Sequence, residues 1–74
     1  MPKLPIVSGI KVVKALHKLG YELDHQTGSH MILRMNKGPF RRLTVPNHNE
    51  LAKGTLRAII RQAGLTVEEF IKLL

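Results

Sequence analysis

The sequence predicts a single α+β domain in which helices pack on one face of a three-stranded antiparallel sheet. Three observations lead to this fold class. The chain has 74 residues, a length that suits one hydrophobic core. Apolar residues recur with helical spacing near both ends and alternate with polar residues in the middle. Short turns separate the alternating segments, as in antiparallel sheets. The expected order over residues 1–74 is helix, three strands, helix and a short final helix.

The first helix is expected over residues 9–19. Apolar residues recur on one face of this segment from Val12 to Leu19, with lysines on the other side. Ser8 is a suitable N-cap, and Gly20 suits the left-handed position just past the C-terminus.

Alternating polarity predicts strands over residues 21–25 and 30–36, joined by a glycine turn. His25, near the end of the first of these strands, is expected to face inward with Leu23. In the second strand every other residue faces the helices, and the intervening ones, beginning with His30, face solvent. The inward set is Met31, Leu33 and Met35.

A third strand is expected over residues 40–45, after a turn at 37–39. Leu43 and Val45 are its inward residues, and Pro46 ends it because proline cannot donate to a ladder.

A second amphipathic helix is expected to run through Leu56 to Ala63 and to end at Gly64, with Thr55 as a candidate N-cap. Thr66 and Glu69 then match a capping box, which predicts a last short helix.

Positive charge is concentrated in one part of the chain. The formal net charge is +7, and residues 30–61 hold seven of the 12 Lys and Arg side chains but one of the 5 acids. Lys53, Arg57 and Arg61 recur every fourth residue and so share one side of the second helix. A solvated basic face is the simpler interpretation, but the clustering favours a phosphate-binding surface.

The composition excludes several classes of protein. With no cysteine there is no disulfide framework, thiolate zinc site or cysteine nucleophile. No apolar run approaches the ~20 residues of a membrane span, and no signal peptide is evident, so we expect a cytoplasmic protein. One Tyr and two Phe are too few for a base-stacking platform, which favours recognition of a nucleic acid through its backbone and shape. Phe70 is expected in the core, Tyr21 could be buried or exposed, and Phe40 could face outward beside Arg42.

The four histidines, at positions 17, 25, 30 and 48, lack the close paired spacing of metal ligands. We therefore expect neither a metal nor a cofactor. His17 is expected on the surface. His30 follows a glycine turn and lies in the basic half of the chain, which makes it a candidate for proton transfer near neutral pH.

Three motifs carry a resemblance to a known family: Gly28-Ser29-His30, Val45-Pro46-x-His48 and Leu51-x-x-Gly54-Thr55-Leu56-Arg57. Together with a closing segment through Glu69-Phe70, they resemble the HicA-type mRNA interferase toxins. The resemblance implies a fold like that of double-stranded-RNA-binding domains, cleavage of mRNA, and a HicB-type antitoxin that blocks the active site. It places the family's catalytic histidine at His30 and the turn glycine at Gly28.

RNA carries its own nucleophile in the 2′-hydroxyl, so its cleavage needs no metal if a side chain moves the proton. His30 is the candidate general base or acid. The side chains and backbone amides expected to hold phosphate are those of Lys37, Arg42, Lys53, Gly54, Thr55 and Arg57. The candidate accessory residues are Gly28, Ser29 and His48. We expect His48 to orient its loop, although it could be a second proton-transfer group.

Two other functions fit the same sequence. A non-catalytic double-stranded RNA-binding module would share the fold and the charge, and a protein-interaction domain would use the basic face against an acidic partner. Affinity for RNA that falls steeply with salt would argue against the protein-only function.

Overall fold

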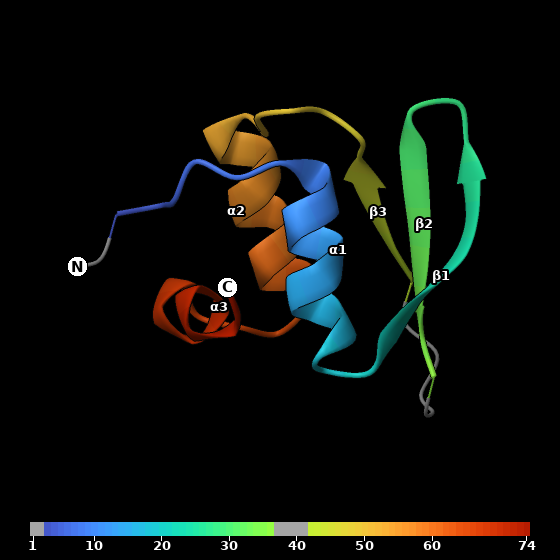
Figure 1. Ribbon diagram of the computed structural model, residues 1–74. Coiled ribbons are helices and arrows are strands. Elements are labelled where there is room, and N and C mark those ends of the chain that lie inside the picture. Colours follow the sequence, from blue (N-terminus) through green and yellow to red (C-terminus); the bar gives the residue numbers. More distant parts are fainter. Residues whose placement is uncertain (1–2, 37–41) are drawn as a thin grey trace.

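The computed structural model describes residues 3–36 and 42–74. The elements in chain order are α1 Gly9–His17, β1 Tyr21–Thr27, β2 His30–Met35, β3 Arg42–Pro46, α2 Lys53–Gln62 and α3 Val67–Leu73. All three helices lie on one side of the sheet, as Figure 1 shows. The predicted α+β architecture is therefore confirmed.

The sheet is antiparallel with strand order β1-β2-β3, so that β2 is central. The predicted alternation in β2 is confirmed, because Met31 and Leu33 are buried while His30 and Arg34 are exposed. β1 is longer than expected and continues to Thr27, which leaves only two residues for the turn. Two expected features lie outside the described residues: the turn at 37–39 and the start of the third strand at Phe40 and Arg41.

The core lies between the sheet and the helices. Leu16 of α1, Leu33 of β2 and Phe70 of α3 are each 0% exposed, which confirms the interior position expected for Phe70. Tyr21 could be buried or exposed by sequence alone, and in the structure it is buried, at 1% exposure. Burying a side chain of this size stabilises a fold by about 1.5–3 kcal/mol.

Local signals fix most helix ends as predicted. The Ser8 Oγ atom accepts a hydrogen bond of 3.1 Å from the backbone N–H of Lys11. Gly20 has a φ of 104°, a left-handed conformation that favours glycine. At α3 the capping box is complete, with reciprocal bonds of 3.1 and 2.9 Å between Thr66 and Glu69.

Two predicted helix limits are wrong. α1 ends at His17, and Leu19 lies in the following turn with 37% of its surface exposed. Thr55 is not an N-cap, because α2 begins at Lys53 after an extended Ala52. The backbone N–H of Leu51 donates to the carbonyl of Val7 at 2.9 Å, and the Leu51 side chain is buried. These two tertiary interactions of Leu51 fix the chain just before α2. The start of the helix is therefore set without a side-chain cap.

The N-terminus of α1 packs directly against the end of β3. A Cβ atom on Gly9 would collide with the carbonyl oxygen of Pro46 and would lie 3.2 Å from the terminal methyl of Met31. The missing side chain at Gly9 therefore allows helix and strand to meet.

Replacing Gly9 with alanine should lower the free energy of unfolding by about 1–3 kcal/mol, because backbone has to move to admit the methyl group. Gly54→Ala is the matched control, since it also changes a glycine in a first helical turn but meets no atom within 4 Å. That substitution should stabilise the protein by roughly 0.5–1 kcal/mol. Chemical denaturation measures both, and a Gly9→Ala midpoint equal to or above that of Gly54→Ala would contradict this description of the packing.

Candidate functional site

Figure 1 shows that the helices leave one face of the sheet uncovered, here called the outer face. Because Met31 and Leu33 of β2 are buried towards the helices, the exposed His30 lies on this outer face. Antiparallel register aligns its residues in three cross-strand rows, because directly opposed residues point to the same side. The rows are Thr27–His30–Pro46, His25–Ile32–Thr44 and Glu22–Arg34–Arg42. We call the first the His30 row and the last the arginine row.

His30 begins the central strand, directly after the turn of Gly28 and Ser29, and its side chain is exposed. Gly28 has a φ of 56°, so the residue that opens this turn is in a left-handed conformation. The Ser29 carbonyl accepts a hydrogen bond of 2.6 Å from the backbone N–H of Asn47. The turn that presents His30 is thus tied to the chain that follows β3.

The loop of residues 47–52 is held from a second side by α1. The backbone N–H of Gly9 donates to the carbonyl of His48 at 2.9 Å, while the His48 side chain is exposed. Backbone bonds therefore bring the motifs around His30 and His48 to the same end of the molecule. The sequence spacing alone did not reveal this proximity.

The first turn of α2 lies at this end as well (Figure 1). Lys53 and Gly54 are exposed and Thr55 is half-buried. The first backbone N–H groups of a helix have no partner within it, and Ala52 supplies no side-chain cap. Arg57 is exposed one helical turn after Lys53, so two cations flank this helix start.

Arg42 is separated from these groups. It is opposite Arg34 in the arginine row, four residues from Pro46 of the His30 row. At ~3.3 Å per residue, the two rows are about 13 Å apart. The structure therefore does not bring Arg42 beside His30, and Lys37 lies outside the described residues.

A pair that the sequence analysis missed lies in the middle of the outer face. His25 was expected to face inward, and this is wrong: its side chain is 52% exposed, and its Nδ1 atom lies 2.9 Å from Oδ2 of Asp24. The register of β1 shifts between Leu23 and His25, which marks a β-bulge at Asp24. Leu23 is 52% exposed but is opposite the buried Leu33, so it keeps its expected position on the helix side of the sheet. The sequence signal for this pair was an Asp directly followed by a His. Strict alternation of faces along the strand placed His25 on the wrong side of the sheet.

The comparison with known families matches residues 9–65 to the family described as HicA toxin of bacterial toxin-antitoxin. The chain belongs to the HicA toxin family. Its match runs from the first residue of α1 to beyond the end of α2 and includes both His30 and His48, while α3 follows it. No curated protein matches the chain. The protein is therefore a toxin of the toxin–antitoxin class, which implies an antitoxin partner.

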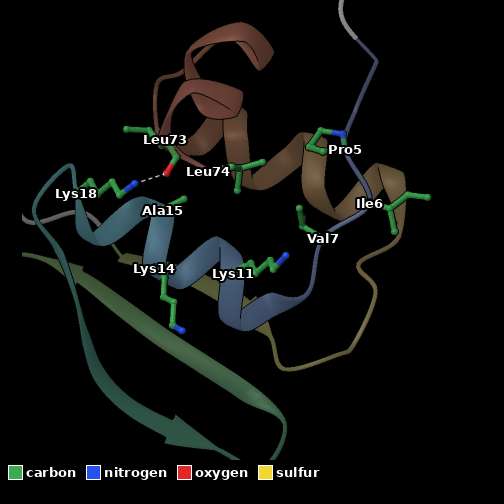
Figure 2. A pocket seen from close by; sticks show the side chains of 9 residues that line it. All are labelled: Pro5, Ile6, Val7, Lys11, Lys14, Ala15, Lys18, Leu73 and Leu74. Carbon is green, nitrogen blue, oxygen red and sulfur yellow. Dashed lines mark hydrogen bonds between the residues drawn. The ribbon is translucent and has the colours of Figure 1, made fainter.

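The toxin also has a groove of about 520 Å³ on its helix side, shown in Figure 2. It lies among the N-terminal segment, α1 and the end of α3, and it is bordered by Lys11 and Lys14 of α1 and by Lys18 just after that helix. One of them, Lys18, donates from Nζ to the carbonyl of Leu73 at 2.8 Å. The groove shares no residue with the outer face, so it is separate from the His30 row.

The described part of the toxin has neither a cluster of metal-binding side chains nor a membrane-spanning helix. No group of three or more His, Cys, Asp or Glu side chains suited to a metal ion occurs within residues 3–36 and 42–74. Over the same described ranges, no helix is long and apolar enough to span a membrane.

Two carboxyl groups of the toxin have pKa values below their ordinary range. The pKa of Asp24 is lowered mainly by its hydrogen bond with His25 and further by the charges of His25, Arg34 and Arg42, against a smaller opposing effect of burial. The pKa of Glu69 is lowered by hydrogen bonds from the backbone and side chain of Thr66. Each carboxylate therefore stabilises the fold above its ordinary pKa, and this contribution is lost as pH falls through the lowered value.

His25→Ala should raise the pKa of Asp24 towards its ordinary value, because the main cause of the lowering is removed. The pKa of Glu69 should stay low in this variant. In the matched control Thr66→Ala it should rise only in part, because alanine removes the side-chain hydrogen bond of Thr66 and keeps the larger backbone one. Carboxyl-carbon NMR during a pH titration reads both groups in one sample. An Asp24 titration that His25→Ala leaves unchanged would show that the two side chains are not bonded in solution.

Proposed function

We propose that this toxin is a metal-independent endoribonuclease that cleaves mRNA, with His30 as a proton-transfer group. The observation that carries the proposal is the placement of His30: an exposed imidazole at the end of the central strand, beside two loops fixed by backbone bonds of 2.6 and 2.9 Å. An exposed, well-positioned imidazole is suited to exchange protons with a bound RNA.

The reaction uses the 2′-hydroxyl of the RNA itself. Attack of the 2′-oxygen on the adjacent phosphorus requires that a base remove its proton, and the phosphorane that forms carries added negative charge. A histidine can supply the base without a metal ion. Such a general base or acid typically contributes about 10²–10⁴-fold to a rate.

Phosphate binding is assigned to the start of α2. Lys53 and Arg57 are exposed and form no ion pair within the described residues, so each is available to an RNA phosphate. The backbone N–H groups of Gly54 and Thr55 add donors, and no atom lies within 4 Å of the position that a Cβ atom on Gly54 would take. Arg42, some 13 Å from the His30 row by the spacing of a strand, would hold a phosphate farther along the RNA. Lys37 remains a candidate for the same task.

The remaining candidate residues support this arrangement. Gly28 and Ser29 present His30, and His48 orients its loop through its backbone carbonyl.

We propose that the antitoxin is of HicB type, covers the His30 row and presents acidic groups, because opposite charge speeds encounter and selects the partner. Cleavage of mRNA places the activity in the cytoplasm.

A non-catalytic double-stranded RNA-binding module is the second candidate. It is favoured by the burial of Tyr21 and Phe70, which leaves neither ring available to stack on unpaired bases. Such a module would bind duplex RNA but would not cleave it.

His30→Ala should lower the rate of RNA cleavage in EDTA by about 10²–10⁴-fold, since the group that moves the proton is lost. The assay uses purified protein and a single-stranded RNA, with products resolved on a gel. His17→Gln is the matched control, because His17 is exposed on α1, away from the outer face, and glutamine can still bond to the Tyr21 carbonyl. That control should keep the parental rate.

Three results would separate the candidates. Equal cleavage by His30→Ala and the parent would remove His30 from the reaction, and a requirement for added metal would reject the mechanism. Binding of duplex RNA by a parent that cleaves nothing would establish the binding module instead.

A further inference from the structure

We propose that His25, oriented by Asp24, is a second catalytic residue and gives a proton to the departing 5′-oxygen of the cleaved RNA. This inference rests on the proposed ribonuclease function and extends it, because cleavage through the 2′-hydroxyl uses both a base and an acid. His30 by itself can fill only one of these two roles.

The register places both imidazoles on the outer face in neighbouring rows. His25 is opposite Ile32, and His30 precedes Ile32 by two residues on the same strand. His25 and His30 are therefore diagonal neighbours on adjacent strands, with a separation of about 7–8 Å between their backbones. A phosphate placed over the two strands could contact one ring through its 2′-oxygen and the other through its 5′-oxygen.

The β-bulge explains how Asp24 can orient His25. Consecutive residues of a regular strand point to opposite faces and cannot bond side chain to side chain across the sheet. The extra residue in β1 removes this alternation, and the two side chains meet with 2.9 Å between Oδ2 and Nδ1. Bulges that re-aim a side chain are common beside active sites. The Nδ1 atom is engaged, so Nε2 is the ring nitrogen left to exchange a proton.

The charges around His25 suit the role of acid. Asp24 is bonded to it at 2.9 Å, and the two side chains form an ion pair whenever His25 is protonated. Among residues 3–36 and 42–74, the other charged groups of the outer face are Glu22, Arg34, Arg42 and, when protonated, His30. The arginine row lies on the side of His25 away from His30, where it can hold the next phosphate of the RNA.

The step balances with the two imidazoles alone. His30 takes the proton of the 2′-hydroxyl, the 2′-oxygen bonds to phosphorus, and the bond between phosphorus and the 5′-oxygen breaks. His25 gives its Nε2 proton to that oxygen. The products are a 2′,3′-cyclic phosphate and a 5′-hydroxyl, and exchange with water restores both rings.

The test compares two leaving groups in the same RNA. After the cleaved linkage has been mapped, one substrate carries the ordinary 5′-oxygen there and the other carries sulfur, which departs as a thiolate without a proton. His25→Gln should lose about 10²–10⁴-fold on the ordinary RNA and cleave the sulfur-bridged RNA at nearly the parental rate. His30→Gln should be slow on both, and His17→Gln should match the parent on both.

Two further readouts guard against a purely structural effect. Asp24→Asn should show a smaller loss with the same dependence on leaving group, and its thermal unfolding should show that the fold persists. The rate of the parent on ordinary RNA should rise and then fall with pH, and His25→Gln should lose one limb of that curve. Equal activity of His25→Gln and the parent on ordinary RNA, or equal losses on both substrates, would overturn the role of His25. A parent that cleaves neither substrate would overturn the ribonuclease function itself.

Discussion

The close approach of α1 to the end of β3 is the constraint from which the rest of the site follows. It depends on Gly9, where a methyl group would strike the carbonyl of Pro46 and crowd Met31. Met31 is the buried neighbour of His30, and Pro46 is its partner across the strands. The same glycine donates its backbone N–H to His48. One packing contact therefore sets the positions of the strand end, the loop and the exposed imidazole together.

The site is held by backbone atoms, and this leaves its side chains free for chemistry. The bonds from Asn47 to Ser29 and from Gly9 to His48 join main-chain groups only. Exposed cations at the start of α2 repel each other mildly, a cost that a bound polyanion would remove. The fold thus concentrates positive charge and an imidazole at one end of the sheet without burying either.

Local chemistry made much of this fold predictable, and tertiary contacts account for the rest. The caps at Ser8 and Thr66 depend on residues three positions away, so the sequence reveals them. The start of α2 depends on Leu51, whose partner is at the other end of the chain, and Thr55 was misassigned. The resemblance of the motif that contains His30 to a known family identified this residue as the candidate catalytic group. The outward position of His25 was not predicted, because a β-bulge in β1 reverses the alternation of faces. The distance of Arg42 from His30 was not predicted either, because it follows from the strand register, and the clustering of charge along the sequence gives no information on register.

The proposed function requires that RNA bind across the outer face at the His30 end. The most direct test is NMR mapping of the toxin with an RNA that lacks the attacking 2′-hydroxyl and so cannot be cleaved. We expect the NMR signals of the His25 and His30 imidazoles to shift as RNA is added, together with those of the backbone amides of Gly54 and Thr55. Shifts confined to the lysines around the groove of α1 and α3, with both imidazoles unmoved, would contradict this expectation.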